Sequence, residues 1–206
     1  MQDKIGRVGL VARFKPLHNG GALMLEAVCE KADHVVIGIG SSNRYNARNP
    51  FTADESREMI DRFLAARFSN YSFVSVPDFG HIPEYSDGNK WRGYVLENYG
   101  KLDHFITSND YVKKLLEDDY DVVHPASLLP KEKQFMLRAT QVRVEMARDG
   151  NWKDLVPEKV AEYLEEKDLV GRFRKEFGLE TIATMIDQNY SGHEGADEEK
   201  AHVGEV

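Results

Sequence analysis

The sequence of 206 residues contains a single cysteine, Cys29. One cysteine excludes a disulfide framework and a cysteine metal site, and Cys29 falls on the apolar side of a predicted helix, so we expect it to pack in the core. No apolar run approaches the roughly 18 residues of a membrane span, and no basic segment followed by an apolar stretch indicates a secretion signal. We therefore expect a cytoplasmic protein without a membrane partner.

An excess of basic residues is also lacking. The chain has 27 Lys and Arg against 35 Asp and Glu, a formal net charge of -8. Because nonspecific binding to nucleic acid depends on an excess of cations, no nucleic-acid partner is expected, and any anionic ligand needs a local cluster of cations. With 41% hydrophobic and 30% charged residues, the composition is ordinary for a globular protein of one domain.

Two common nucleotide-binding motifs are missing. The sequence has no G-x-x-x-x-G-K-[ST] run, which disfavours a P-loop NTPase. The segment Gly38-Ile39-Gly40 begins like a dinucleotide fingerprint, but the third glycine is absent and no strong helical pattern follows at once. A Rossmann oxidoreductase is therefore disfavoured as well.

Short β-branched runs alternate with longer amphipathic ones along the chain. This alternation predicts an α/β fold with a doubly wound parallel sheet. Thr52 and Glu55 have the spacing of a capping box, which predicts a helix start at that point. The expected strands lie near residues 7–12, 34–40, 71–76, 104–107 and 121–124, and the expected helices near 20–31, 53–67, 109–117 and 140–148.

The C-terminal part is expected to be helical. Pro157 suits the first turn of a helix, and the helical region extends over about residues 157–187. We therefore expect a single domain over residues 1–187. Beyond it the sequence contains almost no large apolar residues, which predicts a disordered acidic tail over residues 188–206.

A turn rich in cations and glycine follows the first predicted strand. Its sequence from Ala12 to Gly21 is A-R-F-K-P-L-H-N-G-G. Backbone N–H groups at such a strand-to-helix turn open toward an anion, so the pattern indicates a phosphate site. Alternation along an extended chain predicts that Arg13 and Lys15 lie on one side, away from Phe14. An isolated His18 would be a capping residue, but these neighbours favour a role at the phosphate.

A second cationic segment lies far along the chain, where Arg138, Thr140 and Arg143 surround the start of the helix near 140–148. Thr140 suits the N-cap position. Two arginines oppose the positive end of the helix dipole, and a bound phosphate would remove that conflict. The alternative is a solvated basic helix start.

These segments resemble those of a known family. The run from Ala12 to Gly21 resembles the G-x-F-x-P-x-H-x-G-H signature of the HxGH nucleotidyltransferases, which have a Rossmann-like fold, and in particular of archaeal nicotinamide mononucleotide (NMN) adenylyltransferases. Three further segments extend the resemblance over about residues 5–166: Asn49–Ala53 with Glu55 resembles N-P-F-T-A-G-E-R, Thr140 and Arg143 match an S-x-T-x-x-R-type motif, and residues 151–158 resemble the W-[RK]-x-L-[LV]-P-E segment. In the first segment two positions depart from the family's pattern, Ala12 in place of glycine and Gly21 in place of the second histidine. In the other segments Asp54 and Ser56 stand in place of glycine and arginine, and Arg138 and Ala139 in place of serine and glycine.

The resemblance implies transfer of AMP from ATP to NMN or a related phosphorylated acceptor, with Mg²⁺ bound mainly through the phosphates, by a homo-oligomer. On this template His18, Lys15 and Arg143 are catalytic. The implied nucleotide-binding residues are Ala12, Arg13, Phe14, Gly20, Gly21, Ser108, Asn109, Arg138, Thr140 and Arg143, and the implied acceptor-binding residues are Asp78, Asn89 and Trp91. Trp91 is equally compatible with plain core packing, and Trp152 is expected to pack in the core.

Gly21 leaves the function open among three alternatives, because it lacks the donor that a second histidine would supply. They are an adenylyltransferase with altered machinery, a nucleotidyltransferase for a different phosphorylated substrate, and a catalytically impaired nucleotide-binding protein with a regulatory or structural role. Lys15 or Arg138 is a candidate for a replacement charge.

Overall fold

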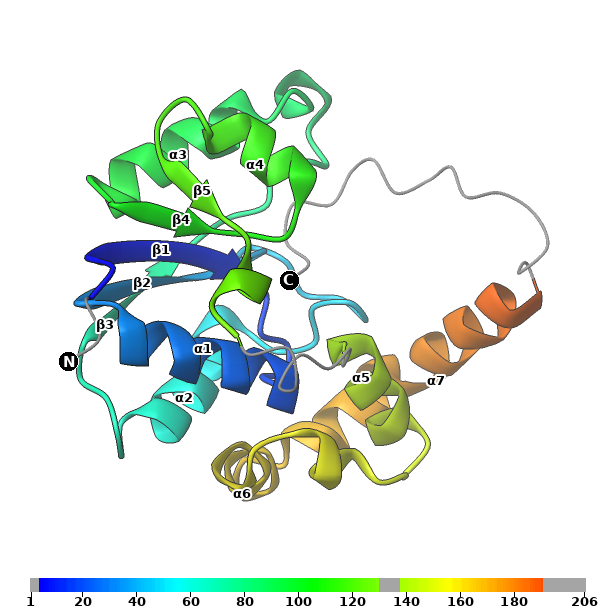
Figure 1. The fold of residues 1–206 in the computed structure, drawn as a ribbon. Helices are drawn as coiled ribbons and strands as arrows, with labels where there is room; N and C mark the ends of the chain where they lie inside the picture. Colours follow the sequence, from blue (N-terminus) through cyan, green and yellow to red (C-terminus); the bar gives the residue numbers. More distant parts are fainter. Residues whose placement is uncertain (1–3, 130–137, 191–206) are drawn as a thin grey trace.

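The computed structural model describes residues 4–129 and 138–190, with side chains up to residue 184. Five parallel strands form one sheet in the order β3-β2-β1-β4-β5 (Figure 1). The strands are β1 (Arg7–Ala12), β2 (His34–Ile39), β3 (Tyr71–Ser75), β4 (His104–Ile106) and β5 (Asp121–Val123). The strand order reverses direction at β1, and in such sheets ligands bind beyond the carboxyl ends of the strands at the reversal.

Helices cover both faces of the sheet. The helices α1 (Asn19–Lys31) and α2 (Ala53–Leu64) lie on one face, and α3 (Asn89–Tyr99) and α4 (Asp110–Leu116) lie on the other (Figure 1). The doubly wound parallel sheet predicted from the sequence is therefore confirmed. Helix α3 was not predicted, although Trp91, Val95 and Tyr99 recur at helical spacing and form its buried side.

The core follows the alternation of the strands. In β1, Val8 and Leu10 pack into the cluster under α1 and α2, while Val11 belongs to the cluster under α3 and α4. Gly38 in β2 lets Tyr99 approach the sheet, where the Tyr99 hydroxyl donates to the carbonyl of Leu10 at 2.9 Å. A Cβ at position 38 would lie 1.8 Å from that hydroxyl oxygen. The need for a glycine here is thus a packing requirement, which agrees with the rejection of a dinucleotide fingerprint.

Two local predictions on this side are confirmed. Thr52 Oγ1 accepts from the Glu55 N–H at 3.1 Å, and the Glu55 carboxylate accepts from the Thr52 N–H at 2.9 Å, so the capping box opens α2. Cys29 is buried in the core, and burial raises the pKa of its thiol to about 12. It is therefore an inert packing residue.

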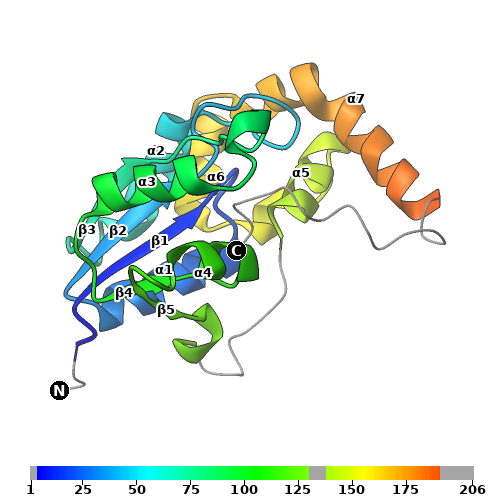
Figure 2. The same ribbon diagram turned by 90° about the horizontal axis from the view of Figure 1, so that it is seen from above.

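The C-terminal part packs beside the carboxyl edge of the sheet, toward which the arrowhead of β1 points in Figure 2. It consists of α5 (Ala139–Ala147), α6 (Glu158–Glu166) and α7 (Leu169–Tyr190). The described residues also contain the short 3-10 turns η1 (Pro83–Tyr85), η2 (Pro125–Ser127) and η4 (Trp152–Leu155). Helix α5 packs against α7, α6 packs against α2, and Trp152 is buried in the first core cluster, as predicted.

Helix α7 continues three residues past the domain boundary expected at residue 187. The rest of the predicted tail, residues 191–206, lies outside the described residues. Within the described part of the chain, no helix combines the length and the apolar character that crossing a membrane requires.

Candidate functional site

The turn after β1 departs from an extended conformation at Phe14. Its φ of 51° lies in the left-handed region, and its side chain is buried. The alternation that predicted a common side for Arg13 and Lys15 therefore ends at Ala12, where β1 stops. The extended chain on which that prediction rests is therefore absent, and the two cations differ in burial, because Lys15 is fully buried whereas Arg13 stays partly exposed.

Lys15 bridges the ends of two neighbouring strands. Its Nζ donates to the backbone carbonyl of Ser41, which follows β2, at 2.8 Å. Burial disfavours the ammonium form, and the adjacent Arg13 guanidinium adds repulsion, which together lower the pKa of Lys15 to about 8. Lys15 is thus a cation near neutral pH, held at the carboxyl edge of the sheet.

His18 caps α1, and its Nδ1 accepts from the Gly21 N–H at 3.2 Å. Burial, followed by the nearby Arg143 guanidinium, lowers the pKa of His18 to about 4. The ring is therefore neutral at pH 7, and because Nδ1 accepts, the proton sits on Nε2. Capping and a role at a ligand are compatible, since the cap uses only one ring nitrogen.

Arg143 brings the second cationic segment to the first. Its guanidinium donates to the carbonyl of Lys15 at 3.0 Å and to Thr140 Oγ1 at 3.0 Å, and Arg143 is only 5% exposed. Two segments 128 residues apart in the sequence therefore meet. Thr140 is not the N-cap residue that we predicted. The N-cap is exposed Arg138, two residues earlier, so that Thr140 lies in the first turn and orients Arg143 instead.

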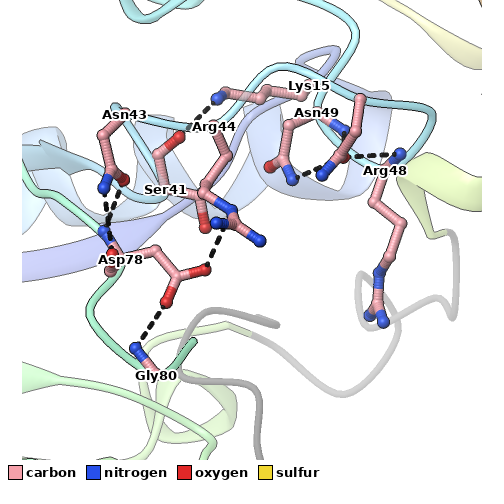
Figure 3. A network of polar contacts seen from close by, with 9 residues as sticks. Lys15, Ser41, Asn43, Arg44, Arg48, Asn49, Asp78 and Gly80 are labelled. Carbon is pink, nitrogen blue, oxygen red and sulfur yellow. Dashed lines mark hydrogen bonds and ion pairs between the residues drawn. The ribbon is translucent and has the colours of Figure 1, made fainter. Parts of the chain in front are cut away.

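The loop between β2 and α2, residues 40–52, adds side chains that the sequence interpretation did not select (Figure 3). Asn43 donates to the Asp78 carbonyl at 3.0 Å and accepts from the Asp78 N–H at 2.7 Å. Arg44 Nε lies 3.7 Å from the Asp78 carboxylate. Exposed Arg48 follows in the same loop. The signal for these residues was their place after a predicted parallel strand, whose carboxyl end lies at the same edge of the sheet as that of β1.

A pocket of about 140 Å³ lies beside the cations. Gly40 and Ser41 line it, so it adjoins the strand end that holds Lys15. Asp78, which follows β3, also lines it, together with Tyr85 of η1, Trp91 of α3 and Tyr111 of α4. A cavity of about 150 Å³ can hold one benzene molecule, so this pocket has room for one aromatic ring. Trp91 is 4% exposed and packs in the second core cluster, so it is both a core residue and part of the pocket wall.

Three predicted residues lie apart from this group. Asn89 is exposed, and its side-chain amide donates to Asp87 at 2.6 Å, outside the set that lines the pocket. Ser108 is exposed after β4. Asn109 caps α4, accepting from the N–H groups of Tyr111 and Val112 at 2.9 and 3.2 Å. Because β4 pairs with β1, Ser108 and Asn109 nevertheless follow the same edge of the sheet.

The side chains at the site suit a metal ion only if a bound anionic ligand, such as a phosphate, carries the ion. The described residues contain no group of three or more His, Cys, Asp or Glu placed to hold one. Apart from Asp78 and Glu55, whose charge acts on Lys15, the side chains gathered here are cationic or neutral. Such a set suits anionic oxygens, which can themselves carry a divalent ion.

Comparisons with known proteins agree with this geometry. Residues 10–194 match the family described as cytidylyltransferase-like. The nicotinamide-nucleotide adenylyltransferase of Thermococcus sibiricus is 34% identical over 184 residues, covering 87% of this chain and 90% of the relative. The enzyme of the same name from Pyrococcus furiosus is 36% identical over 172 residues, covering 80% and 85%.

Among solved structures, the bifunctional NMN adenylyltransferase/ADP ribose pyrophosphatase of Francisella tularensis is similar, with a TM-score of 0.69. The match covers 95% of this chain and 58% of the Francisella chain, and 14% of the aligned residues are identical. At this identity the likeness shows the fold, and this chain spans only part of the bifunctional protein. The family match and the curated relatives together show that the chain belongs to the cytidylyltransferase-like family of nucleotidyltransferases.

Proposed function

We propose that this chain transfers AMP from ATP to nicotinamide mononucleotide or a related phosphorylated mononucleotide and releases pyrophosphate. One observation carries the proposal: the Arg143 contact with the Lys15 carbonyl gathers two cationic segments beside a pocket of the size of one ring. The names of the curated relatives support the same acceptor.

The reaction needs placement and charge more than proton transfer. A phosphate oxygen of the acceptor attacks the α-phosphorus of ATP, a new phosphoanhydride bond forms, and the bond to the β-phosphate oxygen breaks. The attacking oxygen is already anionic, so no general base is required. Rate enhancement comes from in-line orientation and from donors directed at the phosphate oxygens where charge develops.

Neutral and cationic residues have different roles in this reaction. Neutral His18 offers its Nε2–H to the α-phosphate. Lys15 and Arg13 offset negative charge on the triphosphate, and Arg143 with Thr140 holds the departing pyrophosphate. Ala12, Phe14, Gly20, Gly21 and exposed Arg138 complete the nucleotide site, and Ser108 and Asn109 lie on the adenosine side. Mg²⁺ would be held mainly through the phosphates of ATP rather than by side chains of this chain, and it would neutralise part of their charge.

The acceptor's ring occupies the pocket beside Trp91. An indole provides a flat surface for stacking an aromatic ring. Asp78, fixed by Asn43 and close to Arg44, contributes a polar group at the rim. In this proposal the acceptor lies in the pocket beside the carboxyl ends of β2 and β3, and the triphosphate lies at the turn that follows β1.

Gly21 and Ala12 support a second candidate function. Gly21 supplies no side-chain donor at the first turn of α1, and the methyl group of Ala12 stands where close backbone approach to a nucleotide suits glycine. The second candidate is a nucleotide-binding protein that retains the site without catalysing transfer. A transferase for another phosphorylated acceptor is compatible with the same substitution.

Steady-state pyrophosphate release with ATP and a panel of phosphorylated acceptors separates these functions. We expect release that depends on NMN or a related mononucleotide and that His18→Ala diminishes by about 10²-fold or more. Pyrophosphate release with a different acceptor and not with NMN would identify that acceptor as the substrate. No release with any acceptor, together with ATP binding in calorimetry, would contradict the proposed transfer and favour the binding protein.

A further inference from the structure

The loop at residues 40–52 contacts the candidate site at one end and α7 at the other. At the site end, Ser41 accepts from Lys15, and Asn43 fixes the backbone of Asp78 through two hydrogen bonds (Figure 3). The position of this end therefore determines where Lys15 and the pocket rim lie.

Arg172 of α7 holds the other end. Its guanidinium donates to both carboxylate oxygens of Glu55 at 2.6 and 2.7 Å and to the carbonyl of Pro50 at 3.1 Å. Glu55 in turn accepts from the Thr52 N–H at 2.9 Å. One side chain thus fixes the backbone on both sides of Phe51, where the loop enters α2.

Aromatic contacts reinforce this attachment. The Phe51 and Phe173 rings lie 6.4 Å apart, and Tyr45 in the middle of the loop packs edge-on against Phe177 at 5.2 Å. The Tyr45 hydroxyl also donates to the Glu176 carboxylate. Successive turns of α7 therefore follow the loop, and Arg172, at the end of the loop nearest α2, joins the loop, the capping box of α2 and α7.

We propose that Arg172 is a positioning residue for the transfer reaction: through Glu55 and Pro50 it holds the loop that places Lys15 and the rim of the acceptor pocket. A charge-assisted bidentate pair is suited to this task, because its planar fork fixes orientation as well as distance. Arg172 does not line the pocket itself. The inference rests on the proposed function for its kinetic consequence, but the attachment of the loop is testable without it.

The test compares Arg172→Gln with Arg62→Gln. Arg62 makes the same kind of link, joining Glu58 of α2 at 2.7 Å to Glu166 of α6 at 2.6 Å, but it does not contact the loop. For Arg172→Gln we expect faster amide hydrogen exchange over residues 41–50 and an acceptor KM raised about tenfold or more, with a smaller change in kcat. For Arg62→Gln we expect the exchange rates of residues 41–50 and the acceptor KM to stay within about twofold of wild type.

Arg172→Lys gives an intermediate case, since a lysine keeps the charge but cannot donate to both Glu55 oxygens and to Pro50 in the same planar geometry. Should Arg172→Gln fail to fold, Arg172→Lys against Arg62→Lys makes the same comparison. The proposal is overturned if loop exchange in the Arg172 variant matches the Arg62 control, or if exchange rises while the acceptor KM does not. If wild type releases no pyrophosphate at all, the proposed function fails separately, and calorimetric affinity for NMN replaces KM.

Discussion

Replacing Gly21 by histidine restores the one donor that the phosphate site lacks. A Cβ at this position would lie 3.4 Å from Leu17 Cδ1 and 3.8 and 3.9 Å from His18 Cε1 and Nε2. These are ordinary van der Waals distances, so the side chain enters beside the His18 ring without displacing the backbone. Histidine also has a higher helix propensity than glycine by a few tenths of a kcal/mol. We therefore expect Gly21→His to fold with a free energy of unfolding within about 0.5 kcal/mol of wild type.

The expected gain in rate follows from the contribution of one preorganised donor. Such a donor is typically worth about 10²–10³ in kcat, or roughly 2.7–4 kcal/mol of transition-state stabilisation. Because the new ring starts within 3.9 Å of the His18 nitrogen that we propose for the α-phosphate, it can reach the same phosphate. The gain should appear in kcat with little change in KM, since the donor acts where charge develops in the transition state.

Pyrophosphate release at saturating ATP and NMN measures this effect, with Gly21→Ala as the control that adds a Cβ without a donor. A rise in kcat in the histidine variant alone identifies a weakened adenylyltransferase. If the wild-type protein is already active and the histidine variant is slower, the pocket is adapted to a different substrate. If turnover is unchanged while ATP still binds, the non-catalytic protein is favoured. Loss of the cooperative unfolding transition would refute the placement of side chain 21 beside His18.

Three further predictions concern the same site. Arg143→Ala should weaken ATP binding in calorimetry about tenfold or more, because a charge-assisted contact contributes about 1.5–3 kcal/mol. The control is Arg148→Ala, at the exposed C-cap of the same helix, which should leave the ATP affinity unchanged. An ATP affinity of the Arg143 variant within about twofold of wild type would remove Arg143 from the phosphate site. In Trp152→Phe, where Trp91 is the only indole, saturating NMN should quench the emission, and an unchanged spectrum would leave Trp91 as core packing. The kcat/KM should fall as the pH rises through about 8, where Lys15 loses its charge, and Lys15→Arg should abolish the fall; a fall that persists would show that another group titrates.

The sheet and the first turn were predictable because their signals are local. Apolar β-branched runs followed by glycine or by a capping box predicted both the strands and the starts of α1 and α2. Parallel pairing then places all strand ends at one edge, so cations after different strands are brought together by topology alone. The missed helix α3 also carried a local signal, with Trp91, Val95 and Tyr99 on one face between Gly88 and Gly100.

The orientation of individual side chains was not predictable in the same way. Lys15 turns inward because Phe14 adopts a positive φ, which no periodicity encodes. Thr140 was assigned to the cap because threonine favours that position, but the N-cap of α5 is Arg138, two residues earlier, and the Thr140 hydroxyl accepts from Arg143. For Thr140 a tertiary contact decided between conformations that differ little in local free energy. The positive φ of Phe14 is locally unfavourable by about 1–3 kcal/mol and has to be offset by the surrounding structure.

The overall charge explains why burial of these cations matters for the proposed chemistry. With a net charge of -8, the chain as a whole does not attract an anion, so recognition depends on short-range contacts. Lys15 is fully buried and Arg143 nearly so, which means that their desolvation is completed on folding and their charges act strongly on a phosphate in a medium of low dielectric constant. Neutral His18 adds an N–H donor without adding repulsion toward Arg143. A site of this kind does not need to reorganise when charge develops, provided that the loop behind Lys15 stays in place, which is the condition that Arg172 meets.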